Sequence, residues 1–358
     1  MFSSFPPSIR IGLGFGGSIL VLLFQLTPES SQTLRPPISS ETPPYECVQL
    51  RPELGPYQEA SILKAGTYCL AVDFWQSRLS DGAGHSGPAP HRHLIGIKGG
   101  DVNIDMANHI LHSDGHSSGI YTAARSNRGS AEYMKSNYGR ETRNITIKNG
   151  VIDLRGLGTG VALINHWDMH RIDAEIPENI PDYEKSNFVL ENLLIKTDNI
   201  GIILEGEGNT IRNCIIESGG SAAITMAGPG GKIINNTIIL KNPLRAGSMT
   251  GINFGNLESR NIVEFIQEKQ APKAAIALHQ ANGTVISGNR IEVMGSSASR
   301  HSIYLTDSSK DVKIEGNTIM GKSDTITLTK GSTTILKNNV FKLEKPWWIF
   351  WARNVNSP

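Results

Sequence analysis

Residues 201–240 read GIILEGEGNTIRNCIIESGGSAAITMAGPGGKIINNTIIL and contain the same two short phrases twice. One phrase is a small residue, an apolar residue, any residue and a second apolar residue, as in Gly201-Ile-Ile-Leu204 and Ala223-Ile-Thr-Met226. The other places Asn two residues after an apolar residue, as in Ile211-Arg-Asn213 and Ile233-Ile-Asn235. A pair of phrases that returns after 22 residues indicates one supersecondary unit repeated along an axis.

Both phrases recur on either side of this stretch. The first apolar residue of the small-apolar-x-apolar phrase stands at Ile95, Ile120, Val161, Ile202, Ile224, Ile252, Ile276, Ile303 and Ile326. The second phrase reaches its Asn or Gly at Asn149, Asn192, Asn213, Asn235, Gly288, Gly316 and Asn338. From Ile202 to Ile326 the steps are 22, 28, 24, 27 and 23 residues. The chain therefore repeats one unit of about 24 residues.

Each repeat alternates apolar residues with others, which indicates short β-strands with one buried face. Three such strands and three turns fill about 24 residues, the length of a β-solenoid coil. Leucine-rich repeats carry a Leu-x-x-Leu-x-Leu signature that is absent here, and WD-type blades need ~40 residues or more. Asn and Gly tolerate the left-handed backbone of a tight turn. We therefore expect about nine stacked coils, a turn at each Asn or Gly, and a ladder of stacked Asn side chains.

The N-terminus carries a segment of a different kind. Ile11 to Leu26 is a 16-residue stretch without charge, preceded by Arg10. It is shorter than the ~20 residues of a membrane span and has the length of a signal-peptide core, although no small-x-small cleavage site follows. Residues 1–26 are thus a signal peptide, an uncleaved membrane anchor or a buried helix. A signal peptide or a membrane anchor would predict an extracytoplasmic protein that is periplasmic, secreted or anchored.

The rest of the chain fits a single solenoid domain at residues 45–358. Residues 27–44 are rich in Pro, Ser and Thr and predict a linker. Residues 46–74 are expected to cap the first coil. Residues 345–351, which read Lys-Pro-Trp-Trp-Ile-Phe-Trp, are expected to cover the open core of the last coil. Contact of this aromatic segment with lipid or a partner is the alternative.

Charge and cysteine content restrict the partners and the compartment. A net charge of +1 gives no overall field for nucleic acid, so no nucleic-acid partner is expected, and membrane contact is expected only through the N-terminal segment. The oligomeric state is left open by the sequence. Cys214 lies in an apolar run and predicts a core residue. Cys47 and Cys69 flank the start of the folded part and could form a disulfide in an oxidising compartment.

Two segments resemble a known superfamily. Ala65-Gly-Thr-Tyr-Cys-Leu-Ala-Val-Asp73 and Gly100-Asp-Val-Asn-Ile-Asp-Met-Ala-Asn-His-Ile-Leu111 look like the opening of secreted proteins of the pectin-lyase-like superfamily. The resemblance covers roughly residues 60–342 and implies an all-β, single-domain right-handed parallel β-helix. Because that superfamily includes pectate lyases, polygalacturonases, alginate epimerases and carbohydrate-binding proteins, it also implies a polysaccharide partner. The polygalacturonase Asn-Thr-Asp, Gly-Asp-Asp and Gly-His-Gly set is absent, as is the paired Asp ladder of the pectate lyase calcium site.

In that superfamily the substrate groove lies on the outer face of the strand that corresponds to the small-apolar-x-apolar phrase. Residues between and just after the two inward positions of this phrase point outward. Aligned by register, one outward column holds Tyr121, Ala162, Ile203, Thr225, Asn253, Ala277, Tyr304 and Thr327. The next column holds Ala123, Ile164, Glu205, Ala227, Gly255, His279, Thr306 and Thr329. Columns of this kind advance by ~4.8 Å per coil.

The repeat is stretched in two neighbouring coils, because the steps from Ile120 to Val161 and from Val161 to Ile202 are both 41 residues. Both insertions follow the groove strand, and long loops on a rigid scaffold often carry function. Arg and Lys can pair with sugar carboxylates, and Tyr and Trp can stack on sugar rings. Predicted substrate-binding residues in these insertions are Arg125, Arg128, Tyr133, Lys135, Tyr138, Arg140, Trp167 and His170. His166 and Asp168, with Glu205 on the next coil, are predicted catalytic residues; the alternative is a solvated loop with ordinary charges.

A second candidate site comprises Asn253, His279, Tyr304 and Asp307. His279 and Tyr304 are expected on adjacent coils, ~7–8 Å apart at the backbone. Such a pair could transfer protons in the β-elimination of a uronate or in its C5 epimerisation. Both reactions remove the proton next to a carboxylate and need a cation for the enolate charge, for which Arg300 and Lys310 are the nearby loop residues. The alternative is a column of stacked surface residues.

No cofactor is expected. Six histidines are numerous enough to suggest a metal, but their spacing matches no compact ligand motif; they are His85, His91, His93, His109, His112 and His116. A divalent cation such as calcium would have to bind without a recognisable motif. The sequence thus predicts an extracytoplasmic protein that acts on an acidic, uronate-containing polysaccharide, as a lyase or C5-epimerase if it is catalytic. The alternative is a non-catalytic β-helix that binds polysaccharide in export or assembly at the cell envelope.

Overall fold

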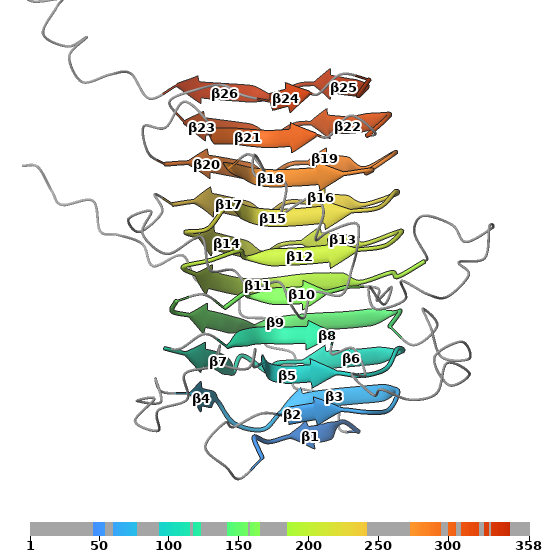
Figure 1. Ribbon diagram of the computed structural model, residues 1–358, viewed down its shortest axis with the longest axis vertical. Coiled ribbons are helices and arrows are strands. Elements are labelled where there is room, and N and C mark those ends of the chain that lie inside the picture. The colour runs from blue at the N-terminus through green and yellow to red at the C-terminus, as the bar shows by residue number, and fades with distance from the viewer. Residues whose placement is uncertain are drawn as a thin grey trace, which may run out of the picture. The chain divides into compact units, whose positions relative to one another are not determined.

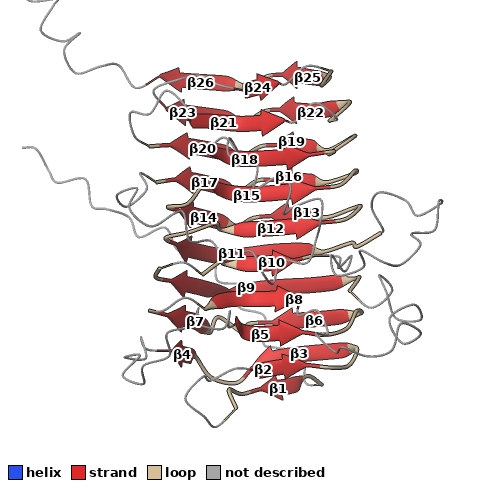
Figure 2. Cartoon of the chain, in the orientation of Figure 1, coloured by secondary structure: helices blue, strands red, loops and turns tan. Residues whose placement is uncertain are grey.

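The computed structural model describes much of the chain between residues 46 and 343. The described residues are 46–53, 60–76, 93–114, 117–122, 142–156, 158–164, 185–241, 273–294, 300–305, 309–321, 326–328 and 331–343. The chain divides into two compact units, residues 1–34 and 35–358, and every described residue belongs to the second. The regular structure of the described residues is β-strand (Figure 2). No helix among them is long and apolar enough to cross a membrane.

Nine described strands form one parallel sheet, which we call the front sheet because it faces the viewer in Figure 1. They are β2 (Ala60–Ile62), β5 (His93–Ile97), β8 (Ser118–Thr122), β10 (Val161–Leu163), β12 (Ile202–Glu205), β15 (Ala222–Ala227), β18 (Lys273–His279), β21 (Arg300–Leu305) and β24 (Ile326–Leu328). Each strand pairs with the next in this order and belongs to a different turn of the chain. The described residues therefore contain nine coils, the number that the repeat predicts.

Seventeen further strands form a second parallel sheet, the back sheet, in two rows. The first row contains β1 (Val48–Leu50), β3 (Gly66–Leu70), β6 (Val102–Asp105), β13 (Thr210–Arg212), β16 (Lys232–Ile234), β19 (Val285–Ser287), β22 (Val312–Glu315) and β25 (Thr334–Lys337). The second row contains β4 (Phe74–Gln76), β7 (Ile110–Ser113), β14 (Ile215–Ser218), β17 (Thr237–Leu240), β20 (Arg290–Val293), β23 (Thr318–Gly321) and β26 (Val340–Leu343). The long strands β9 (Ile145–Leu154) and β11 (Val189–Thr197) run through both rows. A coil thus contributes three strand segments, and its apolar side chains fill the space between the sheets.

The small residue of the front-sheet phrase is explained by close packing inside the coil. At Gly160 a Cβ atom would overlap the carbonyl oxygen of Gly201 on the next coil and would lie 2.7 Å from Ile195 Cγ2 of the back sheet. The same register position holds Gly119, Gly201, Ala223, Ala275 and Ser302 on other coils. A larger side chain here would separate the two sheets, so the phrase begins with a small residue.

The turn between the two rows of the back sheet has the left-handed backbone that the sequence predicts. The residues at this turn have φ between 54° and 65°; they are Asn149, Asn192, Asn213, Asn235, Gly288, Gly316 and Asn338. The predicted Asn ladder exists, but most of it stands one residue later. At the turn itself, Asn192 Nδ2 donates to Asn149 Oδ1. The longer and more buried ladder runs through Asn236, Asn289, Asn317 and Asn339.

One predicted coil is wrong. Ile224 of β15 pairs directly with Ile276 of β18, and β16 and β17 pair with β19 and β20. All three strands of one coil thus stack on all three of the other, which leaves no register position for a coil at Ile252. The step from Ile224 to Ile276 therefore forms a single coil of 52 residues, of which residues 242–272 lie outside the described residues. The four-residue phrase at 251–254 is too short a signal to specify a coil by itself. The total is still nine coils, because β2 forms a front-sheet strand although its sequence does not match the small-apolar-x-apolar phrase.

The beginning of the solenoid is closed by a disulfide. Residues 46–53 and 60–76 form β1 and the first coil, with β1 paired to β3 and β2 to β5. Cys47 and Cys69 form a disulfide with a Cα–Cα distance of 5.7 Å, so the possibility left open by the sequence is realised. Cys214 is buried and free, as expected for a core residue, and burial raises the pKa of its thiol to about 12.

Removal of this disulfide is expected to destabilise the N-terminal coil. The bond closes a loop over a sequence separation of 22 residues, and a crosslink of that length stabilises a fold by about 3 kcal/mol. Urea unfolding of the double variant Cys47→Ser/Cys69→Ser, compared with wild type, should show a loss of that size. Reductant should then affect wild type and leave the double variant unchanged. Equal stability of the two proteins would contradict a role of the bond in the fold.

The end of the solenoid exposes part of its core. Leu336 and Phe341 continue the inward columns of Ile314 and Ile319 but are 54% and 44% exposed. No described coil follows them. Residues 345–351, predicted to cover this end, lie outside the described residues, so the cap stays a prediction.

Candidate functional site

The outer face of the back sheet carries ladders of paired charges. One outward column of its first row contains Asp105, Lys148, Glu191 and Arg212 on successive coils. Lys148 Nζ lies 3.5 Å from Asp105 Oδ2, and Arg212 Nη2 lies 2.7 Å from Glu191 Oε2. In the second row Lys241 forms an ion pair with Glu217. Opposite charges that alternate along a column neutralise one another, so this face has the character of a solvated surface.

The front sheet has a different outer face, built from three outward columns. The middle column contains Gly96, Tyr121, Ala162, Ile203, Thr225, Ala277, Tyr304 and Thr327. The column at the end of the strands contains Lys98, Ile164, Glu205, Ala227 and His279, and that at their beginning His93, Ser118, Thr159, Ile200, Ala222, Ala274 and His301. In the described part of these columns Lys98 and Glu205 are the charged side chains. The predicted register holds for the described members of these columns. Ala123, Asn253, Gly255, Thr306 and Thr329 lie outside the described residues, and the pairing of β15 with β18 leaves no place for Asn253 and Gly255.

Burial divides this outer face into two accessible ends and a covered middle. Ala162, Ile203, Thr225 and Ala277 of the middle column are buried, and Glu205 is only 1% exposed. The half-buried side chains stand toward the two ends of the stack. His93, Lys98 and Tyr121 form the N-terminal group, and His279, His301, Tyr304 and Thr327 form the C-terminal group.

The C-terminal group is organised around Tyr304. Its ring packs against Ala222, Ala274 and Ala277, which are small enough to leave room for it. His301, on the same strand, has its ring centroid 5.5 Å from that of Tyr304, at an interplanar angle of 47°. His301 Nδ1 lies 2.7 Å from Thr327 Oγ1, which fixes the imidazole between β21 and β24. His279 on β18 stands diagonally next to Tyr304, since Ala277 is the direct partner of Tyr304.

The predicted residues thus fall into two classes. His279 and Tyr304 are brought together on adjacent coils as predicted. Glu205 stands in the column of His279, two coils away with Ala227 between them, which is about 10 Å at ~4.8 Å per coil. Outside the described residues lie Arg125, Arg128, Tyr133, Lys135, Tyr138, Arg140, His166, Trp167, Asp168, His170, Asn253 and Asp307. The insertions that hold most of them do follow β8 and β10, two paired strands of the front sheet.

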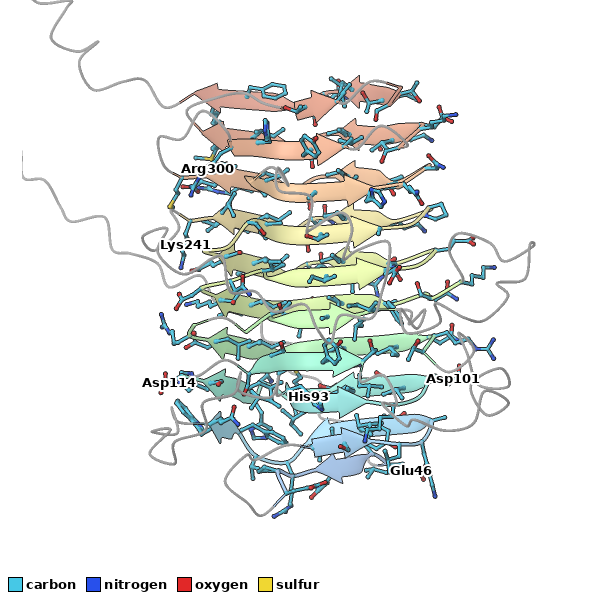
Figure 3. The ribbon with its side chains drawn as sticks, viewed as in Figure 1. Glu46, His93, Asp101, Asp114, Lys241 and Arg300 are labelled. Atoms are coloured by element: carbon cyan, nitrogen blue, oxygen red, sulfur yellow. A yellow bond between two sulfur atoms is a disulfide. The ribbon has the colours of Figure 1, made fainter. Side chains whose placement is uncertain are left out.

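The two nearby cations of the sequence prediction do not face Tyr304. Arg300 is buried, and its guanidinium donates to the carbonyl oxygens of Lys241 and Met294 at the edge of the stack (Figure 3). Lys310 is exposed in the turn after β21, where its backbone N–H donates to Asn282 Oδ1. Among the residues that the structure describes, no group of three or more His, Cys, Asp and Glu side chains is arranged to hold a metal.

Two histidines that the sequence did not assign to the site have a lowered pKa, which favours the neutral imidazole. Burial lowers the pKa of His301 below 6.5; burial and, less strongly, Lys98 lower the pKa of His93. Because the unfolded chain takes up these protons near pH 6.5 and the folded chain only at lower pH, stability should fall as the pH drops from about 6.5 through the lowered pKa values. NMR titration should place both pKa values below 6.5, and His301→Gln should reduce the acid-induced loss of stability. A value above 6.5 for either imidazole would contradict this prediction.

Comparison with known proteins supports the architecture. The family model described as "Right handed beta helix region" matches residues 183–346. The described residues fold as a right-handed parallel β-helix. The resemblance inferred from the sequence is thereby confirmed for the fold. The β-helix is similar in shape to tailspike protein 2 of an Escherichia coli O157:H7 bacteriophage, with 12% identity, a TM-score of 0.46, and coverage of 79% of this chain and 35% of that one.

Two further solved structures are similar to the β-helix. The enzymatically active domain of tailspike protein 2 from bacteriophage CBA120 has 11% identity and a TM-score of 0.42, over 80% of this chain and 38% of that one. The A-module of mannuronan C-5 epimerase AlgE4 from Azotobacter vinelandii has 10% identity and a TM-score of 0.30, and the match covers 77% of this chain and 87% of that one. The β-helix spans little more than a third of the tailspike chains. No curated protein sequence matches it.

Proposed function

We propose that the β-helix acts on an acidic, uronate-containing polysaccharide outside the cytoplasm, as a lyase or C5-epimerase. The observation that carries the proposal is the placement of Tyr304 on the outer face, diagonal to His279 and in ring contact with His301. A phenol between two imidazoles provides groups that can accept and donate protons. In the back sheet, the described histidines on and next to β7 are paired with carboxylates instead: His109 with Asp73, and His112 with Asp114 and Asp153.

The two reactions use the same groups in different ways. In β-elimination a base removes the proton at C5 of the uronate, a C4=C5 double bond forms, and the C4–O4 bond breaks as the leaving oxygen takes a proton. In epimerisation the proton leaves one face of C5 and another is delivered to the opposite face. Tyr304 and His279 are the proposed acid–base pair, and His301 with Thr327 positions Tyr304. The charge on the substrate carboxylate needs donors in either reaction, a role proposed for the basic residues predicted at 125–140.

The disulfide supports the extracytoplasmic setting. Disulfides persist in oxidising compartments and are rare in the cytosol, and Cys47–Cys69 is formed here. It agrees with a signal peptide or anchor at residues 1–26, which lie outside the described residues. No cofactor is part of the proposal.

A second candidate function is polysaccharide binding without chemistry. It is favoured by the described residues around Tyr304, where no Arg or Lys side chain stands in the outward columns. Lyases and epimerases need positive charge or hydrogen-bond donors at the substrate carboxylate, whereas a binding protein does not.

A panel of uronate polymers separates these functions. Alginate, polygalacturonate and glucuronate-containing polymers are incubated with the full chain, and the unsaturated product is followed by absorbance. Epimerisation forms no chromophore and is followed by NMR of the C5 configuration. Product in either assay supports the catalytic proposal. A silent panel with measurable glycan binding would leave the binding function and reject the chemistry.

A further inference from the structure

The N-terminal group on the outer face of the front sheet contains a stacked pair of rings. His93 on β5 and Tyr121 on β8 have ring centroids 5.9 Å apart and an interplanar angle of only 19°. Gly96, the register partner of Tyr121, makes this possible, because a Cβ at Gly96 would overlap the imidazole of His93. The His93 ring therefore lies over the bare backbone of Gly96 and stacks on Tyr121. Tyr121 also packs against the buried cluster that contains Ala162 and Ile203, which holds the stack in place, and both side chains are half-buried, so part of the stack is accessible.

A cation stands next to this platform. Lys98 follows directly after β5, is half-buried, and acts electrostatically on His93. Among the described residues it forms no ion pair, in contrast to Lys148 and Lys241 of the back sheet, which are paired with carboxylates. The N-terminal group thus combines flat rings with an amine whose charge is not compensated by a described neighbour.

We propose that His93, Lys98 and Tyr121 form a second binding site, which takes one acidic sugar unit. The sugar ring would stack on the His93–Tyr121 platform, and its carboxylate would bind the Lys98 ammonium. The choice of a uronate as ligand rests on the proposed function; the pairing of a ring platform with an uncompensated cation does not. A neutral sugar would use the rings alone and bind more weakly.

The position of this site indicates a polymeric ligand. Tyr121 and Tyr304 occupy the same column, and five coil steps from β8 to β21 separate them, or about 24 Å along the axis. The outward residues between them are buried, so a ligand would contact the two sites separately. The N-terminal site would then anchor a polymer at a distance from the Tyr304 group. It contributes to affinity for long chains without contact to the reacting sugar.

Binding of oligouronates to charge variants tests the proposal. Calorimetry of the full chain in the Tyr304→Phe background, in which turnover is expected to be slow, uses a uronate hexasaccharide and a neutral cello-hexasaccharide of equal length. Lys98→Met, which keeps most of the side-chain stem, should weaken uronate binding about tenfold through loss of a charge-assisted contact and leave the neutral ligand unchanged. Lys98→Arg should retain uronate binding within about threefold. The matched control is Lys232→Met, because Lys232 is an exposed lysine of the back sheet.

The outcomes distinguish this site from the proposed function. Equal uronate affinity of Lys98→Met and Lys232→Met would overturn the site, whatever the activity of the protein. An equal loss for the neutral ligand would overturn it too, because the cation would then not select the carboxylate. Lys98-dependent binding by a protein that is silent in the lyase and epimerase assays would leave the site standing and reject only the chemistry.

Discussion

Tyr304→Phe is expected to lower the turnover of a uronate polymer by about 10²–10⁴-fold, the contribution of a positioned acid or base. The substitution removes one hydroxyl and retains the ring that packs on Ala222, Ala274 and Ala277. Stability should therefore change little, and the loss should appear in kcat more than in KM. The measurement is steady-state kinetics on the polymer found in the panel, with thermal unfolding of both proteins.

His301→Gln provides the companion measurement. An amide can replace the hydrogen bond to Thr327 Oγ1 but not the ring contact with Tyr304, so a positioning role predicts a partial loss of kcat and an altered pH profile. Lys232→Met serves again as a distant control with unchanged kinetics. If Tyr304→Phe turned over substrate at the wild-type rate, the acid–base assignment would be rejected together with the active site proposed around it.

The fold could be predicted because its determinants are local and repeated. Asn213 and Asn235 mark turns that need a left-handed backbone, and both have positive φ. Gly160 and Gly201 mark positions where a Cβ atom would meet the neighbouring coil and an Ile side chain of the back sheet. Each of these features recurs in most coils, so the sequence states the same structural rule many times. A single occurrence carries much less information, and the false coil at Ile252 shows this: its phrase matches, but the pairing of β15 with β18 excludes it.

The candidate site could be predicted only in part, for two physical reasons. His279 and Tyr304 follow strict alternation from the inward Ile276 and Ile303, so their outward positions are readable. His301 was missed because the buried residues Ser302 and Ile303 stand side by side between it and Tyr304, which breaks the alternation. The second reason is register. Without the false coil, Glu205 and His279 are two coil steps apart, where the sequence alignment had three.

The Asn ladder illustrates a related limit. The sequence locates the turn because Asn and Gly tolerate its left-handed backbone, and it predicts that the Asn side chains at the turn stack. At that position Asn213 and Asn235 are exposed, whereas Asn149 is buried and accepts from Asn192. The next residue is buried at Asn236 and Asn289, where the backbone amides and carbonyls of neighbouring coils need partners. The ladder therefore forms where buried backbone groups would otherwise lack hydrogen bonds. Which turn residues are buried depends on how neighbouring coils pack, and the sequence phrase does not specify this.

Asn289→Ala is expected to destabilise the solenoid by about 3–5 kcal/mol, because four side-chain hydrogen bonds are lost in a buried environment. Asn289 Oδ1 accepts from the backbone N–H and from Nδ2 of Asn236, at 2.8 and 3.0 Å. Its Nδ2 donates to the carbonyl of Ile233 at 2.8 Å and to Asn317 Oδ1 at 2.9 Å. Alanine leaves the buried Asn236 N–H without its partner and removes one donor from the Ile233 carbonyl, and no water replaces the lost groups in a close-packed interior.

Asn339→Ala is the matched control for this prediction. Asn339 ends the ladder, accepts from the N–H and Nδ2 of Asn317, and is only half-buried. Water can replace its bonds, so the expected loss is about 1 kcal/mol. Urea unfolding of both variants gives the comparison, and amide exchange should show faster opening of β16, β17, β19 and β20 in Asn289→Ala. Equal losses of unfolding free energy in the two variants would contradict the prediction, because a buried ladder residue would then stabilise the fold no more than the half-buried residue at the end of the ladder. The coils would then be held together by their apolar columns and backbone pairing alone.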